Sequence, residues 1–182
     1  YKPYCGSLIC YEKFFYLTGQ AHWSDAIVKA KVAIVGVGNC ASALVQGIHY
    51  YRDRDISEAI GLTGYDLGGL KPGDVEVVAA FDVNVEKVGR DLSEAIFTEP
   101  NNLPKICDVP GLGVVVQRGP CLDGIGKYLK KAVRISESKP VDVAQHLWDS
   151  GAEMVVNYLP VGSGEATGYY ADQALKAGCG FI

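Results

Sequence analysis

The sequence has no long apolar run and no cluster of basic residues, and these absences argue against two classes of partner. The apolar stretches have the length of single strands, far below the roughly 18 residues of a membrane-spanning helix. The chain holds 17 Lys and Arg against 21 Asp and Glu, a net charge of −4, and Lys130 and Lys131 are typical of a solvated helix end. We therefore expect neither a membrane nor a nucleic-acid partner.

Cysteine pairs at C-x-x-C spacing are also absent, which argues against a metal site or a disulfide framework. We expect the cysteines to be reduced thiols: Cys5, Cys10, Cys40, Cys107, Cys121 and Cys179. The histidines fall on different predicted elements and are interpreted as structural or surface residues: His22, His49 and His146. The amino terminus lacks the charged and apolar regions of a secretory signal, so the predicted location is cytoplasmic.

What the sequence does contain is the composition of one globular domain, with 182 residues, 48% hydrophobic and 21% charged. Residues 1–30 form an aromatic-rich leader of unknown role, more typical of packing on the domain or on a partner than of base stacking. From residue 31 onward, strand and helix patterns alternate. Such alternation predicts an α/β fold with a Rossmann-like, doubly wound parallel sheet.

The hydrophobic patterns set the expected bounds of these elements. They predict strands over residues 31–37, 75–82, 113–118, 153–158 and from 180 onward. They predict helices over residues 39–51, 84–97, 140–150 and 163–177. Asn84 is the expected N-cap of the second helix, and Pro140 stands in the first turn of the third. Gly151 and Gly178 are the expected C-caps of the last two helices.

A glycine-rich turn follows the first predicted strand directly and opens the first predicted helix. In the run GVGNCA (36–41), Gly36 permits the tight turn and Gly38 lets a pyrophosphate approach the backbone. Ala41 is small enough for close packing of helix on strand, and the pyrophosphate would lie at the positive end of the helix. The pattern predicts a dinucleotide site, although glycines in such turns also occur for structural reasons alone.

Asp82 ends the second predicted strand and is the expected acceptor for the hydroxyls of the adenine ribose. Its charge would repel a 2′-phosphate, so the predicted cofactor is NAD rather than NADP. The usual distance from the glycines is about 20 residues, and here it is much longer. We interpret residues 52–74, which are rich in glycine, as an insertion. The alternative role of Asp82 is that of a strand-end turn former.

Ligands of open α/β sheets bind beyond the carboxyl ends of the strands, so the residues that follow each strand are the other candidates. Arg118, at the end of the third predicted strand, has two equally weighted interpretations: a contact to cofactor phosphate or ribose, and a solvated or ion-paired surface group. The candidate cofactor-binding residues are Gly36, Val37, Gly38, Asn39, Cys40, Asp82, Val83, Asn84, Arg118, Asn157, Tyr158, Pro160 and Ser163.

Four segments, in order along the chain, resemble the myo-inositol-1-phosphate synthases (inositol-3-phosphate synthases) of actinobacteria and archaea. They are VAIVGVGNCASALVQG (32–47), VVAAFDVNVEKVGRDLSEAI (77–96), VQRGPCLDGIGKY (116–128) and NYLPVGS (157–163). The resemblance extends from about residue 32 to residue 182 and includes the long insertion before Asp82. Residues 1–30 do not resemble this family.

The resemblance implies an isomerase of inositol and phospholipid biosynthesis that converts glucose 6-phosphate to 1D-myo-inositol 3-phosphate. NAD oxidises C5 of the sugar, an enolate forms, C6 attacks C1, and the NADH just made reduces the ring ketone. The loop 157–163 would pass close to the nicotinamide half of NAD. In the family, the lysines for enolisation and phosphate binding come from a later domain, which also forms the homo-oligomer, expected to be a tetramer. We therefore assign no catalytic residue, regard the chain as truncated before that domain, and expect the 182 residues alone to be inactive.

Two alternatives stay open at this point. One is another NAD(P)-dependent oxidoreductase, of the homoserine dehydrogenase or dihydrodipicolinate reductase kind, although the segments after Asp82 give it no support. The other is a non-enzymatic NAD-binding module made by a truncated gene.

Overall fold

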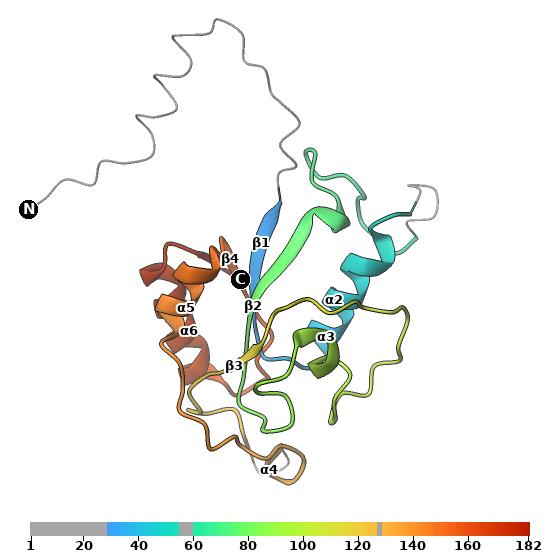
Figure 1. The fold of residues 1–182 in the computed structure, drawn as a ribbon. Helices are drawn as coiled ribbons and strands as arrows, with labels where there is room; N and C mark the ends of the chain where they lie inside the picture. Colours follow the sequence, from blue (N-terminus) through green and yellow to red (C-terminus); the bar gives the residue numbers. More distant parts are fainter. Residues whose placement is uncertain (1–28, 55–59, 127–128) are drawn as a thin grey trace, which may run out of the picture.

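The fold is an open parallel sheet covered by helices on both faces (Figure 1). A computed structural model describes residues 29–54, 60–126 and 129–182, and the described residues form five parallel strands in the order β3-β2-β1-β4-β5. The strands are β1 (Ala30–Val35), β2 (Val75–Asp82), β3 (Val116–Arg118), β4 (Met154–Asn157) and β5 (Gly180–Phe181). The helices are α2 (Asn39–Tyr51), the 3₁₀ helix η2 (Pro72–Asp74), α3 (Leu92–Ala95), α4 (Leu129–Ala132), α5 (Val143–Ser150) and α6 (Gly164–Lys176). The predicted Rossmann-like, doubly wound α/β fold is confirmed.

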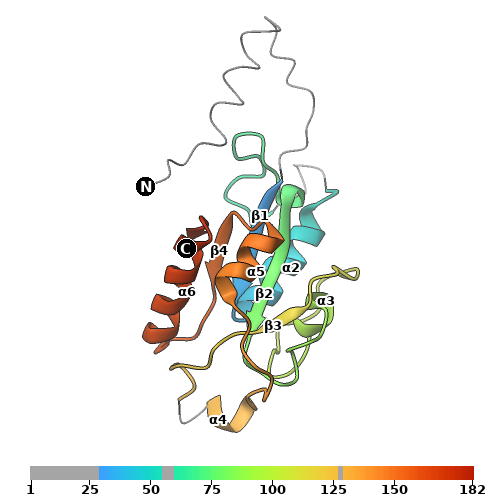
Figure 2. The ribbon, with the colours of Figure 1, turned by 60° about the vertical axis from the view of Figure 1, so that its left-hand side comes forward.

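Alternating side chains of the central strands bury into two separate cores. Ala33 and Val35 of β1 face the helices α5 and α6, whereas Ile34 between them faces α2 and α3. Phe81 and Ala80 of β2 divide in the same way. Figure 2 shows α5 and α6 on the face opposite α2. A strand buried on both faces reads as a continuous apolar run, which is why the sequence pattern of these two strands is unambiguous.

The predicted bounds of two elements are confirmed to the residue, and three more are close. The helix α2 and the strand β2 have the predicted ends, and β1, β4 and α6 differ from prediction by one or two residues at an end. Gly151 is the left-handed C-cap of α5, at φ 66°. The prediction of Gly178 as the C-cap of α6 is wrong by one residue: Ala177 is the C-cap, and Gly178 follows it at φ 76°.

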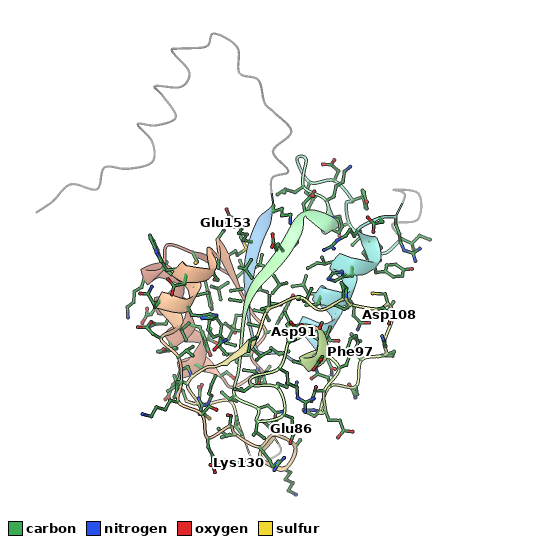
Figure 3. The ribbon with its side chains drawn as sticks, in the orientation of Figure 1. Glu86, Asp91, Phe97, Asp108, Lys130 and Glu153 are labelled. Carbon is green, nitrogen blue, oxygen red and sulfur yellow. The ribbon has the colours of Figure 1, made fainter. Side chains whose placement is uncertain are left out.

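The second predicted helix is wrong in its extent. Sequence patterns placed it over residues 84–97, but α3 begins only after the N-cap Asp91, whose side chain accepts from the Ser93 N–H (Figure 3). Instead of capping a helix, the Asn84 side chain accepts the Glu86 N–H at 3.0 Å, as in an Asx turn. Gly89, at φ 85°, then takes the chain out of any helical path.

Two further predicted elements are too long at their start. The helix over 140–150 begins at Val143, because the Asp142 side chain caps it by accepting the Gln145 N–H at 3.0 Å, and Pro140 lies outside it. The strand over 113–118 is reduced to β3: Gly113 has φ 70°, outside the extended region, and Val115 forms only an isolated antiparallel bridge with Asp91.

The predicted insertion lies between α2 and β2. Its described residues, 52–54 and 60–74, form turns and the helix η2, and Tyr65 Oη donates to the carbonyls of Tyr51 and Arg54. Residues 55–59, and residues 1–28 of the leader with Cys5, Cys10 and His22, lie outside the described residues. None of the helices in the described ranges combines the length and the apolarity that crossing a membrane requires.

Candidate functional site

The winding of the sheet reverses between β1 and β4, and the loops that leave these two strands touch. β1 is central, with β2 on one side and β4 on the other. The Tyr158 N–H donates to the Val35 carbonyl at 2.8 Å, so the chain after β4 stays against the end of β1. Ligands of open α/β sheets bind in the crevice at such a reversal, beyond the carboxyl ends of the strands.

Glycine stands at the two positions of the turn for different reasons. Gly36 has φ 88°, and a Cβ there would lie 2.9 Å from the Tyr158 carbonyl oxygen, so both conformation and space require glycine. Gly38 has φ −93°, open to any residue, and a Cβ there would meet nothing within 4 Å. Packing therefore explains Gly36 but leaves Gly38 without a reason internal to the described structure.

Gly38 is the N-cap of α2, and the first turn of this helix presents backbone donors. The first intrahelical bond runs from the Ser42 N–H to the Gly38 carbonyl at 3.0 Å. No side chain caps the helix, and its first turn holds no acidic residue. Unpaired N–H groups and the helix dipole together make such an end attractive to an anion.

Asp82 joins the glycine turn to the end of β2. One carboxylate oxygen accepts the Val37 N–H at 2.8 Å, and the other accepts the N–H groups of Val83 and Asn84 at 2.7 and 2.8 Å. A carboxylate offers about four acceptor positions, so three are occupied and about one remains for a ligand hydroxyl. The two interpretations of Asp82, turn former and ligand acceptor, are therefore compatible.

A buried lysine that also lines the crevice holds the same turn. Lys87 is 3% exposed, and its Nζ donates to the Val37 carbonyl at 2.6 Å and to Asn101 Oδ1 at 2.7 Å. The Asn101 amide donates in turn to the Val37 and Ile96 carbonyls at 3.2 and 2.9 Å. Burial lowers the pKa of Lys87, and the negative charge of Asp82 acts in the opposite direction.

The loop after β3 forms the opposite wall of the crevice. The Asp123 carboxylate accepts the N–H groups of Glu165 and Ala166, at 2.8 and 2.9 Å, and so docks this loop on the first turn of α6. These hydrogen bonds, the Ala166 N–H first, lower the pKa of Asp123. A Cβ on Gly124 would lie 2.0 Å from Ser163 Oγ, so only glycine permits the approach.

Tyr170 closes the floor between the two walls. Its side chain is 2% exposed, and its hydroxyl would lie 1.8 Å from a Cβ on Gly119, so this position also requires glycine. Burial and then the charge of Asp82 raise the pKa of Tyr170, which keeps the phenol neutral.

The crevice has a volume of about 430 Å³, within the range of small-molecule sites. It brings together ten of the predicted site residues: Gly36, Val37, Gly38, Asn39, Asp82, Val83, Asn84, Tyr158, Pro160 and Ser163. Within the described ranges, no group of three or more His, Cys, Asp or Glu is placed to hold a metal ion.

Three predicted site residues do not line the crevice. Cys40 is exposed on the first turn of α2. The Arg118 side chain turns back to the carbonyls of Ser136 and Gly119, and Asn157 hydrogen-bonds to Thr167 Oγ1 and to the Leu159 N–H. Asn39 does line it, but its side chain is hydrogen-bonded to Asn102 and to the Leu103 N–H, which leaves its backbone for contact with a ligand.

Sequence comparison gives this arrangement a family context. An inositol-3-phosphate synthase of Mycolicibacterium smegmatis is 53% identical over 160 residues, 87% of this chain. Inositol-3-phosphate synthases of Mycobacterium tuberculosis and Corynebacterium glutamicum are each 50% identical, over 87% and 84% of this chain. The chain is a relative of the inositol-3-phosphate synthases. The predicted resemblance is confirmed, although no protein-family model matches.

The similarity covers most of this chain but less than half of each synthase. The chain spans 44% of the M. smegmatis protein and 43% of the M. tuberculosis protein. Among solved structures, the crystal structure of Ari2 superposes with a TM-score of 0.71 at 31% identity, over 85% of this chain and 44% of that one. The match to the synthases is thus a match to a portion that includes the crevice.

Sequence reasoning missed the residues that support the turn and build the second wall. Lys87 was placed on a predicted helix, where a lysine is ordinarily solvated, and Asn101 followed it in a loop without a pattern. The segment PCLDGIG (120–126) did carry a signal, since its Gly124 marks a close approach. It lies within the stretch 116–128 that resembles the synthases, but no role followed from the residues themselves.

Proposed function

We propose that this chain is the NAD-binding portion of an inositol-3-phosphate synthase, the isomerase that converts glucose 6-phosphate to 1D-myo-inositol 3-phosphate. The observation that supports it most is the crevice at the strand reversal, in a chain at least half identical to synthases over most of its length. The crevice combines a glycine turn, a helix N-terminus and a carboxylate at the end of β2. This is the donor and acceptor set that a dinucleotide needs.

The residues present fit NAD. The space beside Gly38, into which a Cβ could be built without contact, suits the approach of a pyrophosphate to the backbone. The remaining acceptor position of Asp82 suits one hydroxyl of the adenine ribose, and its negative charge disfavours a 2′-phosphate. The chemistry that bound NAD supplies is hydride transfer.

On this proposal the chain's residues bind and orient the cofactor and exclude water from it. Gly38 and the first turn of α2 bind the pyrophosphate, Asp82 fixes the ribose, and the loops 120–125 and 158–163 enclose the other half. No residue of this chain is assigned to enolisation. Residues 31–182 would form the NAD-binding unit with an insertion at about 52–74. The catalytic lysines and the contacts of a cytoplasmic homo-oligomer, a tetramer, would come from the parts of the synthases that this chain does not span.

A chimaeric enzyme tests the proposal. The matching segment of the M. smegmatis synthase is replaced by residues 31–182 of this chain, and inositol phosphate formed from glucose 6-phosphate and NAD is measured. We expect turnover, and we expect the same chimaera with Gly38→Val to fold and lose it. A folded chimaera that binds NAD without forming product would contradict the synthase assignment and favour another NAD-dependent oxidoreductase or a binding module.

A further inference from the structure

The Val37–Gly38 peptide is fixed by a buried charge. Its carbonyl oxygen accepts from Lys87 Nζ at 2.6 Å and from the Asn101 amide at 3.2 Å. The preceding N–H, that of Val37, is bonded to Asp82. The peptide therefore has a single orientation in which the carbonyl faces Lys87.

This orientation sets the direction of the Gly38 N–H. The only cis bond in the described ranges is Glu99–Pro100, so the Val37–Gly38 peptide is trans and its N–H points away from the carbonyl. The Gly38 N–H consequently points away from Lys87, and no acceptor in the described part of the chain bonds to it. It stands at the head of α2, on the turn that lines the crevice.

Packing alone does not account for a lysine at this position. A side chain that is 3% exposed loses almost all hydration of its ammonium group, and a methionine of similar length would fill the space without that cost. What an ammonium adds is a charge-assisted bond to the Val37 carbonyl. Such a bond polarises the peptide and makes the N–H at its other end a stronger donor.

We propose that Lys87 is a positioning residue for the cofactor pyrophosphate, acting through the Val37–Gly38 peptide. It orients and polarises the Gly38 N–H toward the anion through its hydrogen bond to the Val37 carbonyl. This inference rests on the proposed function, because the ligand it concerns is the pyrophosphate of NAD.

Two ligands separate this role from general support of the fold. ADP-ribose carries the pyrophosphate, whereas adenosine carries only the ribose and base that Asp82 and its surroundings would bind. Both are titrated into the 182-residue chain and into the variants Lys87→Met and Lys87→Arg. We expect Lys87→Met to weaken ADP-ribose by about tenfold and adenosine by less than about twofold, and Lys87→Arg to retain most of the ADP-ribose affinity.

An equal loss for both ligands in Lys87→Met would show a structural role only, and unchanged ADP-ribose affinity would exclude the role altogether. If the unmodified chain binds neither ligand, the proposed function fails and this inference fails with it. If Lys87→Met does not fold, the NMR signal of the Gly38 amide tests the proposal instead, in the unmodified chain and in Lys87→Arg. Its proton should move downfield when ADP-ribose binds, and a Gly38 amide that does not respond would overturn the proposal.

Discussion

At the scale of single residues, Asp82 has two roles: it supports the glycine turn and, on our proposal, binds the cofactor. A substitution should affect both. Its carboxylate holds the glycine turn through Val37 and the end of β2 through Val83 and Asn84. We expect Asp82→Ala to weaken NAD by roughly ten- to a hundred-fold, since a charge-assisted hydrogen bond of about 1.5–3 kcal/mol is lost.

The same change should lower the free energy of unfolding, because three backbone N–H groups lose their acceptor. Calorimetry for NAD and urea unfolding for stability measure the two effects on one sample. A variant that loses stability but keeps the parent's affinity for NAD would leave Asp82 with the turn-forming role alone.

The glycines of the turn provide a matched pair in which the smaller change should do more damage to the fold. Gly36→Ala places a Cβ against the Tyr158 carbonyl at φ 88°, and we expect it to cost about 1–3 kcal/mol of stability. Gly38→Val meets open space at φ −93°, and we expect a cost of about 1 kcal/mol or less, from the weaker N-cap.

For NAD binding by the folded protein, we expect the opposite order: Gly38→Val should do more damage than Gly36→Ala. Gly38→Val should weaken NAD by about tenfold or more, because its side chain occupies the approach of the pyrophosphate. Urea unfolding and NAD titration on both variants give the two rankings. If Gly38→Val binds NAD as the parent does, the glycine turn is structural and the dinucleotide lies elsewhere.

At the scale of elements, the attachment of the loop 119–126 to α6 should depend on pH. Hydrogen bonds from Ala166 and Glu165 lower the pKa of Asp123 in the folded chain, so its contribution to stability is full above the unfolded value of about 3.9. That contribution is lost as the pH falls through the lower, folded pKa.

The variant Asp123→Asn tests this, because it keeps the size of the side chain and removes its charge. We expect the variant to be less stable than the parent at pH 7, with the difference shrinking as the pH falls below about 3.9. Urea midpoints of both proteins at pH 7 and pH 3 make the comparison. A difference that stays constant across this range would show that the carboxylate charge does not hold the loop.

An element could be predicted accurately from the sequence where its own residues determine its structure, and not where contacts with other parts of the chain do. The helix α2 and the strand β2 were predicted to the residue, because an apolar face or an apolar run buried in the core fixes their pattern. The start of α3 was missed because Asn84 favours both a helix cap and an Asx turn, and only the surrounding contacts select the turn. The role of Lys87 was missed for the same kind of reason, since it depends on a contact with Val37, which lies 50 residues earlier in the chain.

At the scale of the whole molecule, the strand order determines which residues can form a site. The reversal between β1 and β4 brings together the turn 36–38 and the loop 158–163, and β2 adds Asp82 beside them. Sequence reasoning could place these residues at one edge of the sheet, because all strands were predicted to be parallel. It could not separate Gly38, which lines the crevice, from Arg118, which turns away, since both stand at the carboxyl end of a strand.

The most direct test of the account is a calorimetric titration of the 182-residue chain with NAD and with NADP. We expect saturable binding of NAD at one site per chain, and NADP weaker by about tenfold or more, because Asp82 repels the 2′-phosphate. Equal or tighter binding of NADP would contradict the assignment of Asp82. Failure to bind NAD at all would contradict the proposal that this crevice is a dinucleotide site.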